Sequence, residues 1–206
     1  MRAIRYLLLL YVMCFFTLLC MSFACTLGVI EFDILSRIFY DAPAPSHHRH
    51  VDWNADGDMV AVVGDMGFFV FSEQLEKEFH SKLISCLSVS WNPHENIIAV
   101  SDGDRVAFFD GTTFEEVHDV PAANVQIVTW SPSGKYVAIG LGGKIQIRSA
   151  DGKQTEKTVT LSGFSIYSLT WSPNSLMIAA SADGENIVRI YNAIAMQEEY
   201  SYSKSS

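Results

Sequence analysis

The protein has 206 residues, with 14 Lys and Arg against 23 Asp and Glu, and a formal net charge of −9. Its hydrophobic content of 49% is enough for a packed core and excludes a chain that is disordered by composition. Nucleic acids and anionic lipids are bound mainly through clustered Lys and Arg, so the acidic balance argues against a nucleic-acid partner.

Residues 1–30 are strongly apolar and predict a signal or anchor segment. No charge occurs from residue 6 to residue 30, and as a helix this stretch would exceed the roughly 30 Å hydrocarbon layer of a membrane. The phrase Ser22-Phe23-Ala24 has the small-x-small form that signal peptidase accepts, so cleavage stays an alternative. We expect a hydrophobic N-terminal helix that makes the protein membrane-associated and single-pass through residues 6–30. Arg2 and Arg5 favour a cytoplasmic N-terminus, although the side of the membrane stays open.

Residues 31–46 predict a linker, in which two prolines restrict the backbone. His47, His48 and His50 follow it, but neighbours in an extended chain point to opposite sides and no further ligands complete a tetrahedral zinc site. We therefore predict no metal site there.

Residues 47–203 contain four copies of one repeat. The four tryptophans stand in similar phrases, 38, 39 and 41 residues apart, and an alanine follows each of them by eight residues. These repeat markers are Trp53, Trp91, Trp130, Trp171, Ala61, Ala99, Ala138 and Ala179. The spacing predicts a meander of four strands for each copy.

Two features of the copies support a meander of strands in sheets that are covered on both faces. The second strand, for example residues 59–63, has no polar side and predicts burial on both faces. The pairs Asp102-Gly103, Gly142-Gly143 and Asp183-Gly184 favour the positive backbone angles of tight turns between the second and third strands.

The repeats resemble the blades of WD40 β-propellers. The resemblance is carried by Trp-Ser-Pro at Trp130 and Trp171, by Trp-Asn at the other two tryptophans, and by the ending from Asp183 to Tyr191 and Asn192. No copy has the literal Trp-Asp or Gly-His pair of that family. The resemblance implies an all-β fold of about four antiparallel blades and a non-enzymatic scaffold that binds proteins.

Two other interpretations stay open. TolB-like propellers also use Trp-Ser-Pro-x-Gly-Lys, as at residues 130–135, which would imply a secreted or periplasmic propeller that binds envelope proteins. The chain could instead supply the noncatalytic propeller of a larger protein. Four WD40-type blades would leave two open sheet edges, so self-association through these edges is a further expectation.

No residue pattern predicts catalysis or cofactor binding. Asp52, Asn54, Asp56 and Asp58 match the opening of a calcium-binding loop, but its twelfth position is Val63 in place of a bidentate carboxylate. A hairpin turn is the simpler interpretation. Residues 204–206 are expected to be a tail.

Overall fold

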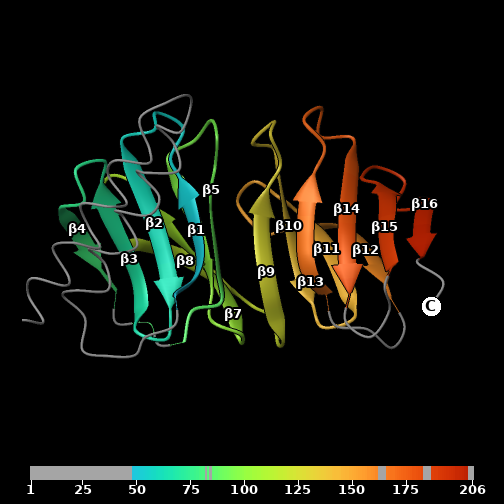
Figure 1. Cartoon of the computed structure of the whole chain (residues 1–206), viewed down its shortest axis with the longest axis horizontal. Helices are drawn as coiled ribbons and strands as arrows, with labels where there is room; N and C mark the ends of the chain where they lie inside the picture. The colour runs from blue at the N-terminus through green and yellow to red at the C-terminus, as the bar shows by residue number, and fades with distance from the viewer. Residues whose placement is uncertain (1–47, 82, 84, 162–165, 183–186, 204–206) are drawn as a thin grey trace, which may run out of the picture. The chain divides into compact units, whose positions relative to one another are not determined.

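The computed structural model describes residues 48–81, 83, 85–161, 166–182 and 187–203. They belong to one compact unit, Pro43–Ser206, and the other unit, Met1–Ala42, contains no described residue. In the described residues, four sheets of four strands each are present (Figure 1). The strands are β1 (His48–Trp53), β2 (Met59–Gly64), β3 (Gly67–Ser72), β4 (Lys77–His80), β5 (Ser88–Trp91), β6 (Ile97–Ser101), β7 (Arg105–Asp110), β8 (Glu116–Pro121), β9 (Val125–Trp130), β10 (Tyr136–Leu141), β11 (Lys144–Ser149), β12 (Thr155–Thr160), β13 (Ile166–Trp171), β14 (Met177–Ala182), β15 (Ile187–Asn192) and β16 (Glu198–Ser203).

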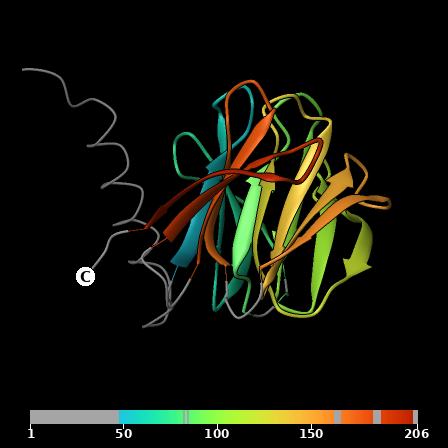
Figure 2. The same ribbon diagram turned by 90° about the vertical axis from the view of Figure 1, so that its right-hand side faces the viewer.

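We call the sheets blades 1 to 4 in chain order. Consecutive strands of each blade pair antiparallel, and the first strand of each blade packs on the first strand of the next: β1 on β5, β5 on β9 and β9 on β13. The front face of a blade is the one toward the preceding blade, and the back face is the one toward the following blade. In Figure 2 the view is turned so that the outer strands of blade 4, drawn in red, face the viewer.

The same register recurs in all four blades. The residue before each tryptophan pairs with the marker alanine of the second strand: Asp52 with Ala61, Ser90 with Ala99, Thr129 with Ala138 and Thr170 with Ala179. Because side chains alternate between faces of a strand, each tryptophan points to the front face and each marker alanine to the back face. A repeated sequence phrase therefore produces a repeated surface.

Apolar side chains fill the three junctions between blades. The cluster between blades 1 and 2 contains Phe68, Val89 and Trp91; that between blades 2 and 3 contains Phe108, Val128 and Trp130; and that between blades 3 and 4 contains Ile147, Leu169 and Trp171. Sheets that are covered on both faces need no polar side, which explains the dense second strands β2, β6 and β10. In β14, by contrast, Met177, Ala179 and Ser181 are only partly buried.

Turn residues with positive φ connect the strands. Gly57 (φ 74°) lies in the β1–β2 turn, and Gly103 and Gly142 lie in the β6–β7 and β10–β11 turns. The latter two belong to the pairs from which turns were predicted. The third pair, Asp183-Gly184, lies outside the described residues.

The predicted all-β fold of four-stranded antiparallel blades is confirmed. The hydrophobic N-terminal helix and the linker were predicted for residues 1–46, and these lie outside the described residues. The predicted single-pass membrane location is wrong for the described part of the chain. Its residues form strands, and no helix among them has both the length and the apolar character that a membrane crossing requires.

Candidate functional site

The four marker tryptophans occupy the last position of the innermost strand in each blade. Trp91, Trp130 and Trp171 are 4%, 5% and 8% exposed, whereas Trp53 is 39% exposed. Among the marker alanines the exposed one lies in blade 4 and not in blade 1. Ala61, Ala99 and Ala138 are fully buried, and Ala179 is partly exposed. The difference follows from stacking, because a tryptophan is covered by the preceding blade and an alanine by the following one.

The hydrogen bonds of the indole groups are not repeated. Trp91 Nε1 donates to Asn96 Oδ1 at 2.9 Å, and Trp171 Nε1 donates to the Thr129 carbonyl at 3.2 Å. Tyr191 is buried on β15 in the same cluster as Trp171, while Asp183 lies outside the described residues. The repeated property is therefore the packing position of the tryptophan and not its hydrogen bond.

A second contact occurs at the inner part of two junctions, between blades 1 and 2 and between blades 2 and 3, and was not predicted from the sequence. The Trp91 backbone N–H donates to Asp52 Oδ2 at 2.8 Å, and the Trp130 backbone N–H donates to Ser90 Oγ at 3.1 Å. Each acceptor is the residue before the tryptophan of the preceding blade. In the sequence, the only indication of this contact is that Asp52 and Ser90 are polar residues placed between an apolar residue and a tryptophan.

The junction between blades 1 and 2 also partly buries a histidine, His50, close to Asp52. The Val89 backbone N–H donates to His50 Nδ1 at 3.3 Å, and the Ser88 hydroxyl lies 3.0 Å from the same nitrogen. Burial lowers the pKa of His50, an effect that the nearby Asp52 partly opposes. Burial raises the pKa of Asp52, although hydrogen bonds from Trp91 and Ser90 oppose that shift.

We expect His50 to make the protein less stable in mild acid. Its pKa is lowered by folding, so the unfolded chain takes up the proton first as the pH falls through about 6.5, and stability is lost. Asp52 acts in the opposite direction, because a raised pKa removes stability as the pH rises above about 4. His50→Asn should therefore reduce the loss of stability between pH 7.5 and 5.5, measured by urea unfolding. An unchanged pH dependence in His50→Asn would contradict this assignment.

The calcium-loop residues form a hairpin turn. Asn54 Oδ1 accepts from the backbone N–H groups of Asp58 and Met59, each at 3.1 Å, and Asn54 Nδ2 donates to Asp58 Oδ1. Asp52 instead accepts from Trp91 in the next blade, so the side chains do not converge. No cluster of metal-ligating side chains is found among the side chains that the structure describes, which include His50 but not His47 or His48.

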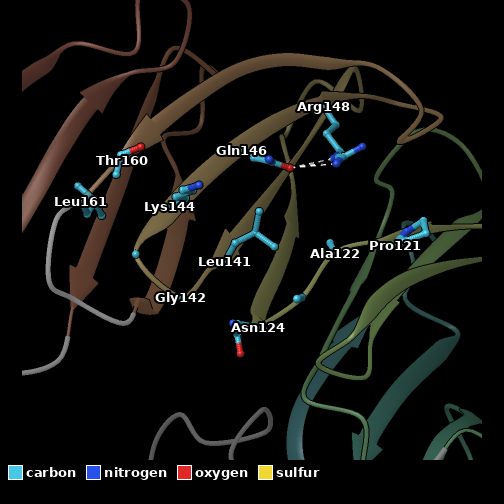
Figure 3. A pocket seen from close by; sticks show the side chains of 12 residues that line it. Pro121, Ala122, Asn124, Leu141, Gly142, Lys144, Gln146, Arg148, Thr160 and Leu161 are labelled. Carbon is cyan, nitrogen blue, oxygen red and sulfur yellow. Dashed lines mark hydrogen bonds between the residues drawn. The ribbon is translucent and has the colours of Figure 1, made fainter.

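A groove of about 490 Å³ lies between the outer parts of blades 2 and 3 (Figure 3). One side is formed by the end of β8 and the connection to β9, from Pro121 to Asn124. The other side is formed by the front face of β11, where Lys144, Gln146 and Arg148 alternate with two buried isoleucines. The positions of blade 2 that correspond to Gln146 and Arg148 are the apolar Ala107 and Phe109, so the front face of blade 3 is polar at two positions where blade 2 is tightly packed.

The Arg148 guanidinium is held in the groove by hydrogen bonds to two neutral oxygens. Its Nη2 donates to Gln146 Oε1 at 3.0 Å and its Nη1 donates to the Gly152 carbonyl at 3.0 Å, as Figure 3 shows for the glutamine. Partial burial lowers the pKa of Arg148, and within the described part of the chain no carboxylate forms an ion pair with it. The guanidinium is thus oriented by neutral oxygens, a setting in which a carboxylate ligand would form stronger, charge-assisted bonds.

Comparison with solved structures supports the propeller fold. A chain in the crystal structure of the mitotic checkpoint complex matches with a TM-score of 0.70 and 17% sequence identity, over 80% of this chain and 53% of the solved one. This chain therefore spans about half the length of that solved chain. A search of curated proteins by sequence gave no match.

Comparison with protein families gave a match over residues 51–196, which include all four tryptophans. The matching family is described as eukaryotic translation initiation factor eIF2A, a family of WD40-like propellers. With the structural match, this confirms the predicted WD40-type propeller. Because the family model matches well over half of the sequence, the chain belongs to the eIF2A family.

Proposed function

We propose that this chain is a non-enzymatic protein-interaction scaffold of the WD40 type. Rigid stacked blades hold their connecting loops and outer strands in fixed positions, which suits them to binding proteins by shape and charge. The structural match to a chain of a multiprotein complex supports this role.

The groove between blades 2 and 3 is the proposed docking site, and Arg148 is the observation that carries it. The chain is acidic overall, yet this groove presents Lys144 and an ordered guanidinium beside the apolar Pro121 and Leu141. A peptide segment with an Asp or Glu would pair its carboxylate with Arg148 and place neighbouring apolar side chains against the groove wall. The ligand is therefore an acidic segment of a partner protein.

Charge reversal in the groove tests this proposal. In affinity capture with quantitative mass spectrometry, Arg148→Glu combined with Lys144→Glu should reduce capture of specific partners by about tenfold or more, since the ligand carboxylate would then meet like charge. Lys157→Glu is the matched control, because Lys157 is an exposed residue on the other face of the same blade, opposite Ile147. Equal capture by all three proteins would contradict a role for the groove.

The family description gives the first partners to test. Members are described as translation initiation factors, so proteins of the initiation machinery are the proposed partner class. Partners of this class should be enriched with the wild-type chain and depleted with the groove variant. Capture of unrelated proteins that still depends on Arg148 would support the scaffold role but not this partner class.

A further inference from the structure

Arg148 departs from a pattern that the other three blades share. Its backbone pairs with Val137, which itself pairs with Trp130. The same position of the other blades holds an aromatic residue with a buried ring. These residues are Phe71, Phe109 and Tyr191, which are 9%, 3% and 3% exposed. Blade 3 therefore carries a cation at a position where each of the other three blades buries an aromatic ring.

Arg148 also differs from the other arginines that the structure describes. Arg49, Arg105 and Arg189 each form an ion pair with a carboxylate of this chain, and within the described residues Arg148 forms none. Hydrogen bonds to Glu116 raise the pKa of Arg105, whereas burial lowers the pKa of Arg148. A partly buried guanidinium of this kind gains strong, charge-assisted bonds when a ligand supplies a carboxylate.

Gln146 occupies the side of Arg148 that such a carboxylate would take. Its Oε1 accepts from Nε at 3.3 Å and from Nη2 at 3.0 Å, as the dashed lines in Figure 3 show. These two N–H groups form a fork that a carboxylate binds with its two oxygens. The amide offers one neutral oxygen to both donors, so it orients the fork without neutralising its charge.

The two side chains are held together by the strand that carries them. Gln146 and Arg148 are two residues apart on β11, so both lie on the front face of blade 3. On the other side of the guanidinium, Nη1 donates to the Gly152 carbonyl in the β11–β12 turn at 3.0 Å. Gln146 lines the groove and is only partly buried, so its amide has room to turn away from Arg148 while that second bond stays in place.

We propose that Gln146 is a neutral occupant of the Arg148 fork, which the carboxylate of an acidic segment displaces when that segment binds in the groove. This inference rests on the proposed function and identifies the residue that keeps the site open. A glutamate at position 146 would have the same length and shape but would pair with the guanidinium permanently. Arg105 shows such a closed pair, because its Nη1 and Nη2 donate to the two oxygens of Glu116 at 2.6 and 3.2 Å.

A direct measurement of the fork needs no partner protein. In Gln146→Glu, made in the full chain, the pKa of the introduced carboxyl group should fall to about 3 or below, from the ordinary value for Glu of about 4.3, because an adjacent cation favours the charged form. Carbon-13 NMR across a pH titration measures this pKa. Gln197→Glu is the matched control, since it makes the same change at an exposed residue of blade 4 and should not lower the pKa. An ordinary pKa in Gln146→Glu would overturn the inference, because a carboxylate would then not take the fork.

Affinity capture with quantitative mass spectrometry tests the consequence for binding. Partners that are lost from Arg148→Glu combined with Lys144→Glu should also be reduced about tenfold or more by Gln146→Glu, because Arg148 is then paired within the chain. Gln197→Glu should capture them like the wild type. Gln146→Ala removes the amide without adding a charge, so it should reduce capture less than Gln146→Glu does.

The outcomes separate this inference from the proposed function. If Gln146→Glu keeps partners that the charge-reversed protein loses, the groove is a docking site but Gln146 does not control it. If Gln146→Ala loses as much capture as Gln146→Glu, the glutamine itself binds the partner, and the inference is again overturned. Equal capture by every variant would overturn both the proposed function and this inference, whatever the pKa in Gln146→Glu.

Discussion

Replacing Ile147 with alanine should lower the free energy of unfolding by about 3 kcal/mol, within the usual range for truncating a buried isoleucine. Ile147 is 2% exposed and lies in the cluster that joins blades 3 and 4. Its removal leaves a cavity against the tightly packed front face of blade 4, and the surrounding sheets can close that cavity only partly.

The repeat supplies the control for this substitution. Ile190 is the same residue type at the same position of blade 4, opposite Ala179 as Ile147 is opposite Ala138. Since Ile190 is partly exposed, Ile190→Ala should cost about 1 kcal/mol in dilute protein, where less buried area is lost. Urea unfolding of the two variants measures the difference. Equal losses would mean that blade 4 is covered as well as blade 3 within one chain.

Replacing Gly152 with alanine should cost a similar amount, about 3 kcal/mol, from steric overlap and backbone strain together. Gly152 follows β11 with φ 69°, and a Cβ there would overlap the ring of Phe108 in blade 2. The ring cannot move aside, because it is fully buried and stacks on His118 with centroids 4.6 Å apart. His118 Nε2 in turn contacts the Asp151 carbonyl, which ties blade 2 to this turn.

Gly57→Ala separates the two causes. Gly57 has a similar φ of 74°, but a Cβ there meets no atom within 4 Å. This substitution should therefore cost only the backbone strain, about 1 kcal/mol. The backbone strain of an alanine should be similar at the two positions, because their φ angles are similar. The difference between the two variants in free energy of unfolding, measured by urea unfolding, therefore reports the overlap with Phe108. Equal losses would show that Gly152 is required for its φ alone.

The sequence alone was sufficient to predict the blades. The recurring tryptophans and alanines predicted a four-stranded unit. When similar sheets stack, a side chain that packs at the same place in each sheet recurs in the sequence at the length of one sheet. Paired turn residues such as Asp102-Gly103 located the hairpins, since few residues accept a positive φ.

The contacts between blades required the structure. From the sequence, Asp52 was assigned to a polar turn. In the structure its carboxylate accepts a hydrogen bond from the Trp91 backbone N–H in the next blade. The groove at Arg148 was also missed, because it forms between a connection and a strand that are separate in the chain.

The chain sequence determined the repeating unit of this protein, because strand alternation and turn chemistry are local properties that a period of about 40 residues records. Only the tertiary structure decided that Trp53 and Val188 are exposed while their counterparts are buried. Equivalent positions of the repeat place their side chains on the same face of each blade. Whether such a side chain is buried depends on whether another blade lies against that face.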